Sequence, residues 1–479
     1  MKTQKTRNWK NRSGKFDWTF FLKSVAVIGV PVALQNLLST TGSMIDTMML
    51  AAIGEKAVGA VGLCAQFSSL MFACYWGFVG GGMMFFSQYW GAKDEKGINK
   101  TFGLTFLCMS VVSFAFAAVC ILNPSFLLEV YTDKTAIIEE AAPYMRIVGF
   151  AYPLQTFAVL ISFLLRTTER VKAPLICSIV SLVVNFCINY VLIYGKFGMP
   201  KMGVAGAAVG TLASGAVNLI LLFLYLLRSK CSVSLHLSQM FVFKGGFIRR
   251  YLLNAFPILC NELLYGVGQM LVNIVIGHQD ESAIAAMAAF RVCEGFVYAF
   301  FGGLSNATSV VVGQAVGAGD HMRAYRFMKR SALFCPLITF AIVLTCAVLH
   351  QPLLSLFGLG DTAMVYGMYM LYIYLFFGSV RTCNYIMNEG YRAAGEAVFG
   401  TVVETCGLFL ISVPATWISG MVLHAPFLLV FSFVYTDELI RLVIELIYTR
   451  SGKWIKPVTE LGKEKLPQFR ELLKGSAGA

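Results

Sequence analysis

The sequence predicts an all-α polytopic membrane protein with twelve transmembrane helices arranged as two parallel six-helix repeats. Three observations lead to this prediction: a high apolar content, apolar runs long enough to cross a bilayer, and an internal repeat. Of the 479 residues, 57% are hydrophobic and only 13% are charged, whereas soluble domains are about a quarter charged. Twelve helices of about 20 residues need roughly 240 residues, which the apolar fraction supplies. This composition excludes a soluble enzyme, a secreted disulfide scaffold and a disordered regulator.

Apolar runs of 18 or more residues mark the expected membrane spans. They cover residues 22–50, 58–86, 102–123, 144–165, 173–195, 203–227, 250–277, 283–313, 331–350, 364–388, 397–419 and 426–448. The first run is too long for a cleaved signal sequence, so we expect it to remain as the first helix.

The net charge of +13 is explained by the positions of the basic residues. Seven lie in residues 1–23 and seven more from Arg450 onward. Loops predicted on the same side carry most of the others, including Arg166, Arg392 and five between Arg228 and Arg250. The opposite loops hold only Lys56, Lys134, Lys196 and Lys201. By the positive-inside rule we expect a multi-pass cell-membrane protein with both termini in the cytoplasm, and no nucleic-acid partner.

No signature of an enzyme or of a nucleotide-driven pump is present. The thirteen cysteines form no C-x-x-C pair, and all but Cys231 lie in or beside apolar runs, where cysteine acts as a small hydrophobe. None of the five histidines falls in the middle of a predicted span. There is no G-x-x-x-x-G-K-[ST] motif for binding ATP phosphates. We therefore expect no catalytic residues and no cofactor.

The chain aligns with itself without a gap when Pro31 is placed on Pro257. At this offset the other aligned pairs include Gly42 with Gly268, Met44 with Met270, Gly77 with Gly303, Gln88 with Gln314, Gly91 with Gly317, Asp94 with Asp320 and Arg166 with Arg392. Such self-similarity indicates a duplicated unit. Because each unit contains six spans, both enter the membrane from the same side and the repeats are parallel.

This repeat divides the chain into five parts. They are a cytoplasmic N-terminal segment (1–21), an N-lobe with helices one to six (22–227), a cytoplasmic connector (228–249), a C-lobe with helices seven to twelve (250–448) and a cytoplasmic C-terminal tail (449–479). Duplicated bundles of this kind form substrate sites between their halves and alternate access by rocking. Pro31 and Pro257 are placed to kink the first helix of each half, either as moving hinges or as static bends.

Four polar residues are predicted at one depth in the N-lobe. Asp46 lies late in the first span, Asn185 and Asn189 share a face of the fifth at i and i+4, and Thr211 lies in the sixth. An ionisable residue inside a span costs roughly 2.5–3.5 kcal/mol and calls for an explanation. One interpretation is an oxygen cage for Na⁺ or a protonatable site. The other is that Asp46 is only a hydrogen-bonded anchor near the outer boundary.

The C-lobe contains a different set of charges. Glu262, Arg291, Glu294 and Arg381 all fall within predicted spans. They could neutralise one another and only stabilise packing, or a carboxylate could be released from its arginine when a cation or proton binds. Glu389 and Glu404 are expected near the cytoplasmic ends of their helices, in contact with solvent.

Several motifs resemble those of the multidrug and toxic compound extrusion (MATE) family, over roughly residues 20–450. They are Pro31 to Asp46, the Gln88-x-x-Gly91-Ala92-Lys93-Asp94 and Gln314-x-x-Gly317-Ala318-Gly319-Asp320 pair, the run from Asn185 to Gly198, Gly206-Ala207-Ala208 before Thr211, and Arg392-Ala393-Ala394-Gly395-Glu396. The resemblance implies twelve helices in two lobes with cytoplasmic termini.

The resemblance also implies antiport of small amphipathic, often cationic organic compounds against Na⁺ or H⁺, with Asp46 as the cation-coupling carboxylate and Asn185 and Thr211 as its companions. Arg381 stands where some sodium-coupled members carry an acidic residue in helix ten, which argues against their C-lobe sodium site in this chain. We expect a monomer in membrane lipid. The alternative is a lipid-linked precursor flippase of the same superfamily, which would need a more cationic central cavity.

Overall fold

The computed structural model describes residues 17–131, 134–228, 235–243, 245–355 and 357–477, and these ranges contain helices and no strands. In the first half the helices are α1 (Trp18–Ser24), α2 (Val30–Ala51), α3 (Glu55–Ala92), α4 (Glu95–Leu122), α5 (Pro124–Glu129), α6 (Thr135–Thr167), α7 (Lys172–Tyr194) and α8 (Val204–Arg228). After the short α9 (Leu237–Met240), the second half contains α10 (Gly245–Gly277), α11 (Glu281–Gly317), α12 (His321–Val348), α13 (His350–Ser355), α14 (Asp361–Ala393), α15 (Ala397–Gly407), α16 (Val413–Trp417), α17 (Phe427–Phe433), α18 (Thr436–Ser451) and α19 (Glu460–Ala477).

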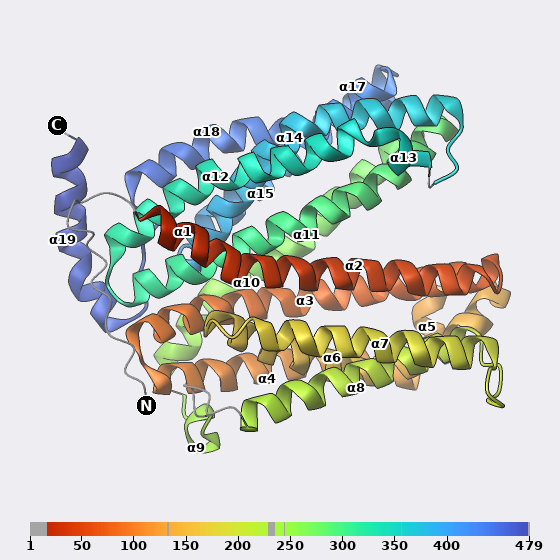
Figure 1. Cartoon of the computed structure of the whole chain (residues 1–479), viewed down its shortest axis with the longest axis horizontal. Helices are drawn as coiled ribbons and strands as arrows, with labels where there is room; N and C mark the ends of the chain where they lie inside the picture. The colour runs from red at the N-terminus through yellow and green to blue at the C-terminus, as the bar shows by residue number, and fades with distance from the viewer. Residues whose placement is uncertain (1–16, 132–133, 229–234, 244, 356, 478–479) are drawn as a thin grey trace.

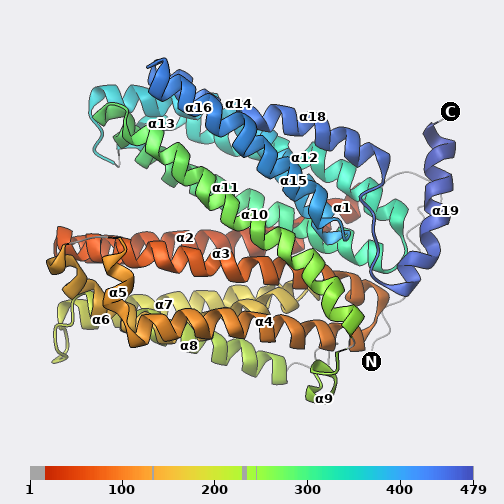
Figure 2. The same ribbon diagram turned by 180° about the vertical axis from the view of Figure 1, so that it is seen from behind.

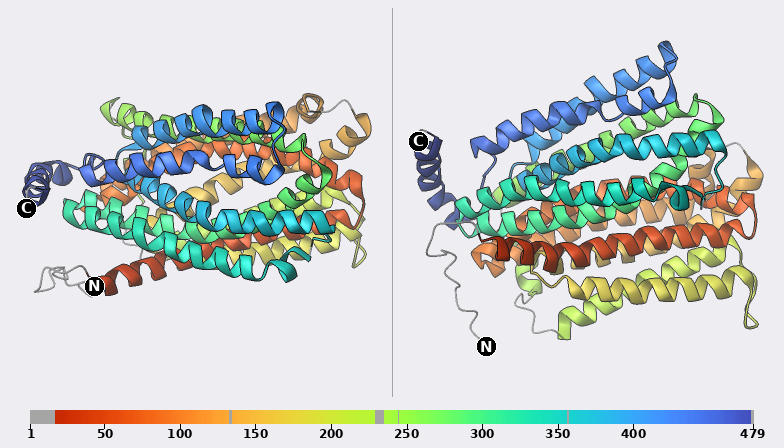
Figure 3. Two further views of the ribbon diagram at one scale, coloured as in Figure 1. Left: turned by 90° about the horizontal axis from the view of Figure 1, so that it is seen from above. Right: turned by 45° about the horizontal axis from the view of Figure 1, so that its top comes forward.

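Two helical bundles meet at one end of the molecule and diverge toward the other. One contains α2 to α8 and the other α10 to α18, and the divergence is visible from both sides (Figures 1 and 2). We call the meeting end, where α1 begins and α19 lies, the basal end, and the opposite one the distal end. Seen from above and at 45°, most of the long helices run roughly along the long axis of the molecule (Figure 3).

Eleven helical segments of the described chain are long and apolar enough to cross a membrane. They match the first eleven predicted spans. The twelfth, expected at 426–448, is broken between α17 and α18 near Val434 and Tyr435. At this break the Ser412 hydroxyl donates a hydrogen bond to the Val434 carbonyl at 2.6 Å. Because both pieces are short and α18 is rich in charged residues, neither is long and apolar enough to cross a membrane alone.

The first membrane helix is irregular at its proline. A π-helical turn covers Val25–Gly29, immediately before Pro31 in α2. Proline lacks a backbone donor and crowds the preceding turn, and a π turn is one way for a helix to absorb that defect. Pro257 is instead accommodated within a continuous α10.

The Gln-x-x-Gly-Ala-x-Asp motif builds the same corner twice. Asp94 caps α4 by accepting a hydrogen bond from the Gly97 backbone at 2.9 Å, and Asp320 caps α12 through the Arg323 backbone at 3.2 Å. An aspartate at this position satisfies an otherwise unpaired helix donor. The residue before each cap has a positive φ, which glycine adopts without strain at Gly319.

The two corners are bound to each other across the halves. The Gln88 side chain donates to the Ala393 carbonyl of α14, and Gln314 donates to the Thr167 carbonyl of α6, each at 2.9 Å. Gly91 lies against the Gln314 backbone, and Gly317 against the Gln88 backbone. The two contacts of each kind are equivalent under the sequence repeat. The internal repeat is therefore visible in space as a twofold-like basal junction.

Small residues continue this junction along the helices. A Cβ on Gly77 would lie 2.5 Å from the Leu259 backbone of α10, and one on Gly303 would lie 2.7 Å from the Ala33 backbone of α2. Glycine permits such close helix contact in membranes.

The chain after α18 reinforces the basal end. Trp454 and Ile455 are fully buried. The Val458 backbone donates to Gln88 Oε1 at 2.8 Å, and the Thr459 hydroxyl donates to the Gly317 carbonyl at 2.8 Å. This segment thus contacts the corner motifs of both halves. In the connector, the His236 backbone donates to Asn99 Oδ1 of α4 at 2.7 Å.

We predict that Gly91→Ala and Gly317→Ala each destabilise the protein by about 1–3 kcal/mol, as overpacking does elsewhere, because a backbone carbonyl occupies the position of the new methyl group. Thermal unfolding in detergent micelles measures the effect. Gly59→Ala in α3 is the matched control, since its Cβ would meet nothing within 4 Å. Equal melting temperatures for all three variants would show that the backbones are not in close contact at Gly91 and Gly317.

Candidate functional site

Asp46 and Asn189 form the centre of a polar site in the first half. Asn189 Nδ2 donates to Asp46 Oδ1 at 2.8 Å and to Asn185 Oδ1 at 3.2 Å. The i, i+4 spacing on α7 aligns the two amides, and Asp46 approaches them from α2. The structure thus brings three of the four sequence-predicted residues into one hydrogen-bonded chain.

A cavity of about 290 Å³ opens beside the hydrogen-bonded residues Asp46, Asn189 and Asn185. Asp46, Asn185 and Thr211 all line it, together with Gln155 and Asn218. Thr211 Oγ1 donates to the Ala207 carbonyl of its own helix at 3.1 Å. Thr211 therefore shares the cavity with Asp46 and is not hydrogen-bonded to it. At Asn189 it is the amide nitrogen that faces the carboxylate, so the predicted cage of four oxygens is not formed in this arrangement.

A glycine on α8 makes room for Asn189. A Cβ added at Gly210 would collide with Asn189 Oδ1. Asn189 is fully buried, and its Oδ1 has no hydrogen-bond partner within the described chain. The position of the amide beside Asp46 thus depends on a glycine in the neighbouring helix.

Asp46 also differs from the other acidic groups inside the membrane bundle. Within the described ranges no lysine, arginine or histidine forms an ion pair with Asp46. A carboxylate without a basic partner in a span needs another source of compensation. Hydrogen bonding by Asn189 supplies part of this compensation, and Asp46 also lines the cavity.

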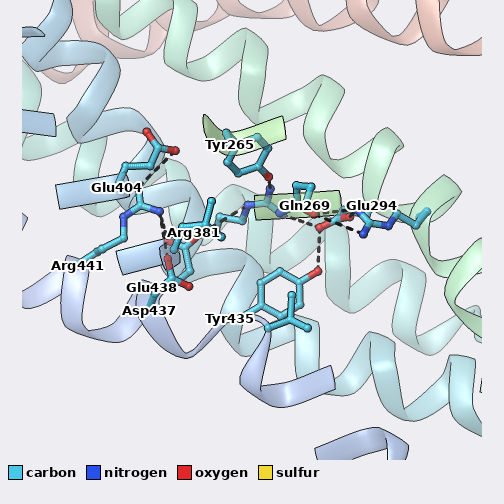
Figure 4. A pocket seen from close by; sticks show the side chains of 12 residues that line it. Tyr265, Gln269, Glu294, Arg381, Glu404, Tyr435, Asp437, Glu438 and Arg441 are labelled. Atoms are coloured by element: carbon cyan, nitrogen blue, oxygen red, sulfur yellow. Dashed lines mark hydrogen bonds and ion pairs between the residues drawn. The ribbon is translucent and has the colours of Figure 1, made fainter. Parts of the chain in front are cut away.

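The second half contains a ladder of ion pairs, of which Figure 4 shows the centre. Arg381 pairs with Glu294 at 2.5 Å and with Glu438 at 3.7 Å, and Tyr265 accepts a hydrogen bond from Arg381 at 2.8 Å. Arg291 lies 3.9 Å from Glu294. Three of the four charges predicted in the C-lobe therefore form one cluster.

Glu262 belongs to the other end of the ladder. It lies 3.8 Å from Arg392, which also pairs with Glu389 at 2.8 Å and with Glu404 at 3.7 Å. The expectation that Glu389 and Glu404 are solvated is wrong: their side chains are 20% and 15% exposed, and the two glutamates share Arg392. Asn261 and Asn388 also donate to Glu404.

The assignment of Arg392 and Arg166 to loops is wrong as well. Both lie in the last turn of their helices and are 8% and 7% exposed. Basic side chains at a helix C-terminus are stabilised by the helix dipole. An arginine at the end of a span can therefore be buried instead of facing solvent.

Arg441 joins the two ends of the ladder. It lies 3.8 Å from Glu404, 3.6 Å from Asp437, 3.5 Å from Glu438 and 3.7 Å from Glu445. The sequence interpretation did not single out these α18 carboxylates. The signal was available, because three acidic residues and one arginine interrupt an apolar run at i, i+1, i+4 and i+8.

Carboxylates outnumber guanidiniums in this ladder. It contains four arginines and seven carboxylates: Arg291, Arg381, Arg392 and Arg441, with Glu262, Glu294, Glu389, Glu404, Asp437, Glu438 and Glu445. Because uncompensated buried charge is costly, this excess of acidic groups favours protons or a cationic ligand in the second half.

Two adjoining cavities lie between the halves. One, of about 90 Å³, is lined by Glu262, Arg392 and Glu404. The other, of about 120 Å³, is lined by Asn36 and Arg166 of the first half and by Tyr298, Glu389 and Arg392 of the second. Trp76, Tyr298 and Tyr385 line both. Aromatic walls with a few charged groups are typical of a site for an amphipathic molecule.

Comparisons with known proteins agree with this architecture. The family model described as MatE matches residues 31–191 and again 257–418, and these two matches begin at the two aligned prolines. The chain is 22% identical over 411 residues to the uncharacterized transporter YisQ of Bacillus subtilis, covering 86% of this chain and 90% of that protein. It is 21% identical to a probable multidrug resistance protein, NorM, of Thermotoga maritima, covering 94% of this chain and 96% of that protein.

Solved structures share the fold. A mutant form of the Vibrio cholerae MATE transporter VcmN superposes with a TM-score of 0.83 at 14% identity, covering 93% of this chain and 99% of that one. The family's members are transporters and not enzymes. Because the family model matches the chain twice, over residues 31–191 and 257–418, this chain belongs to the MatE family of multidrug and toxic compound extrusion transporters.

Proposed function

We propose that this chain is a secondary active antiporter that exports small amphipathic, cationic organic compounds across the cell membrane in exchange for Na⁺ or H⁺. The observation that carries the proposal is Asp46: a carboxylate in a membrane helix, open to a cavity, hydrogen-bonded by Asn189, and without a basic partner in the described chain. Binding a cation or a proton would offset the cost of this charge.

The positive-inside rule supports a cytoplasmic position for the basal end, which carries the basic segments of the chain. The halves diverge at the distal end (Figure 1), so this arrangement corresponds to an outward-facing state. Export would then require the reverse rocking motion, in which the hydrogen bonds of Gln88 and Gln314 across the halves break and the basal end opens.

Helix α2 connects the Asp46 site to the junction. Eleven residues before Asp46, about 16 Å along the helix, Gln35 accepts a hydrogen bond from Arg166 of α6 at 2.6 Å. The next residue, Asn36, donates to the Ala299 carbonyl of α11 at 3.5 Å. A shift of α2 on cation binding at Asp46 would therefore alter a contact between the halves.

The two candidate coupling ions place different demands on the site. A proton needs only the free Asp46 oxygen, whereas Na⁺ needs several oxygen ligands. The Asn189 amide, whose Oδ1 has no partner among the described residues, would have to rotate to present that oxygen to Na⁺. Exchange at Asp46 is compatible with either ion.

Substrate recognition is proposed at the acidic ladder and the adjoining cavities. The seven carboxylates outnumber the four arginines, so acidic groups remain to bind a cationic group of the substrate. The flippase alternative is not favoured, because the Arg392 side of the cavity is dominated by carboxylates and the NorM relative is a probable multidrug resistance protein. We also propose that the chain functions as a monomer embedded in membrane lipid.

Asp46→Asn is expected to abolish gradient-driven export, because an amide neither carries the charge nor exchanges a cation. Uptake of a fluorescent organic cation by inside-out proteoliposomes, under separately imposed sodium and proton gradients, measures the effect and identifies the ion. Glu139→Gln, at an exposed position of α6, is the control and should transport normally. Full export by Asp46→Asn would contradict the proposal.

Gly210→Ala is expected to lower the apparent affinity for the coupling cation about tenfold, as the loss of a residue that orients an ion ligand does elsewhere, since the methyl group would displace Asn189 from Asp46. The cation dependence of initial uptake rates gives this value. Gly215→Ala on the same helix, whose nearest contact is 3.4 Å from Gln155, should behave as the parent protein. Equal cation affinities for the two variants would show that Asn189 has no role in cation coupling.

Arg441→Met is expected to lower the free energy of unfolding by about 3–5 kcal/mol, as removal of one partner of a buried ion pair does, because it leaves four carboxylates facing one another. Arg291→Met, at a side chain that is 37% exposed, should cost much less. Thermal unfolding in lipid nanodiscs compares them. Similar losses for both variants would argue against mutual neutralisation in the ladder.

A further inference from the structure

A strap of chain after α18 lies against the closed basal end. We define the strap as residues 453–462, which lead from the end of α18 into the first residues of α19. It has little regular structure before α19 begins, yet Trp454, Ile455 and Val458 are buried. The chain then continues in α19, which runs across the direction of the long helices (Figure 1). The strap is therefore part of the packed basal end and not a loose tail.

One attachment of the strap is to the turn between α14 and α15. The Lys456 backbone donates to the Ala394 carbonyl at 2.9 Å, and the Lys456 ammonium group pairs with Glu396. Gly395 lies between these two partners with a φ of +94°, and a Cβ there would collide with the Lys456 carbonyl. Because glycine adopts this backbone conformation without strain, the turn can lie directly against the strap.

Another attachment is to α11 and α12. The Thr459 hydroxyl donates to the Gly317 carbonyl at 2.8 Å, and His321 Nε2 lies 2.8 Å from the Gly462 carbonyl. Further along α19, the Phe469 ring packs on the His321 ring with their centres 5.8 Å apart. Since α11, α12, α14 and α15 all belong to the second half, the strap and α19 should move with that half.

On the side of the first half, the hydrogen bonds that the strap makes within the described residues involve the backbone of Val458. Its N–H donates to Gln88 Oε1 of α3 at 2.8 Å, and its carbonyl accepts a longer hydrogen bond from Arg250 at 3.5 Å. Arg250 lies where α10 packs against the first half, since the hydroxyl of the next residue, Tyr251, donates to Thr105 of α4 at 3.0 Å. The strap is thus attached to the first half at a single point.

We propose that the strap is a latch, which moves with the second half and holds the basal end closed through the bond from Val458 to Gln88. Gln88 also donates to the Ala393 carbonyl, so opening toward the cytoplasm breaks both bonds of this side chain. The contacts of Lys456 and Thr459 lie within the moving half and are kept. The latch favours the outward-facing state, and its release is a step of the transport cycle. This inference rests on the rocking motion of the proposed function, whichever ion drives it.

Distances across the basal end of the full chain test the latch, in lipid nanodiscs without substrate or ion gradient. Spin-labelled non-natural amino acids at the exposed positions Lys96 of α4 and Arg326 of α12 report them by double electron–electron resonance. Val458→Pro removes the N–H that reaches Gln88. It should raise the ratio of long to short distances about fivefold, the effect of losing one hydrogen bond. Deletion of residues 453–479 should raise this ratio at least as much.

Glu460→Pro is the matched control. It places proline two residues further along, at the first position of α19, where the N–H lies outside the helical hydrogen-bond pattern and proline is favoured. This variant should keep the distances of the parent protein. A label at the exposed Lys453 shows which half the strap follows. In Val458→Pro its distance to Lys96 should lengthen, while its distance to Arg326 should stay constant.

Equal distance distributions for Val458→Pro and Glu460→Pro would overturn the proposal. A similar lengthening of both Lys453 distances would overturn it too, because the strap would then have come loose from both halves. If the deletion variant does not fold, Val458→Pro decides alone. Export that is insensitive to Asp46→Asn would refute the proposed antiport and leave the fivefold change at the basal end in place, so the two claims can fail separately.

Discussion

The crossed hydrogen bonds of Gln88 and Gln314 are the contact on which the arrangement of the two halves depends. Each glutamine reaches the carbonyl that follows the terminal arginine of the opposite half, and each neighbouring glycine permits the backbone approach that makes this possible. The segment after α18 adds a hydrogen bond to Gln88 and another to Gly317. A transporter that alternates access has to break these bonds, so their net contribution of about 1 kcal/mol each suits a junction that forms and opens.

The two halves have the same framework and different chemistry. In the first half, a single carboxylate is held by an amide beside a cavity, and one buried arginine lacks an acidic partner within the described chain. In the second, four arginines and seven carboxylates form a continuous ladder. Charge is therefore distributed unequally across the cavity between the halves, and this asymmetry, more than the size of the cavity, would select what binds there.

The fold and the proximity of Asp46, Asn185 and Asn189 could be predicted from the sequence, because their signals are local or periodic. The apolar runs, the ungapped internal repeat and the i, i+4 asparagines lie directly in the chain, and Asp46 was notable because charge is rare in a span. The break before α18 and the role of Arg441 could not be predicted in the same way, since they depend on tertiary pairing. Glu404, Arg166 and Arg392 were misassigned because a position near the end of a span does not reveal whether helix packing removes the side chain from solvent.

The cation binding proposed at Asp46 should control the basal junction through α2. Hydrogen-exchange mass spectrometry of the full chain in lipid nanodiscs, comparing the parent protein with Asp46→Asn, tests it most directly. We expect altered exchange in peptides covering residues 88–95, 314–320 and 454–462, far along the molecule from the substitution. A change confined to α2, α7 and α8 around residue 46, with the junction peptides unaffected, would contradict it.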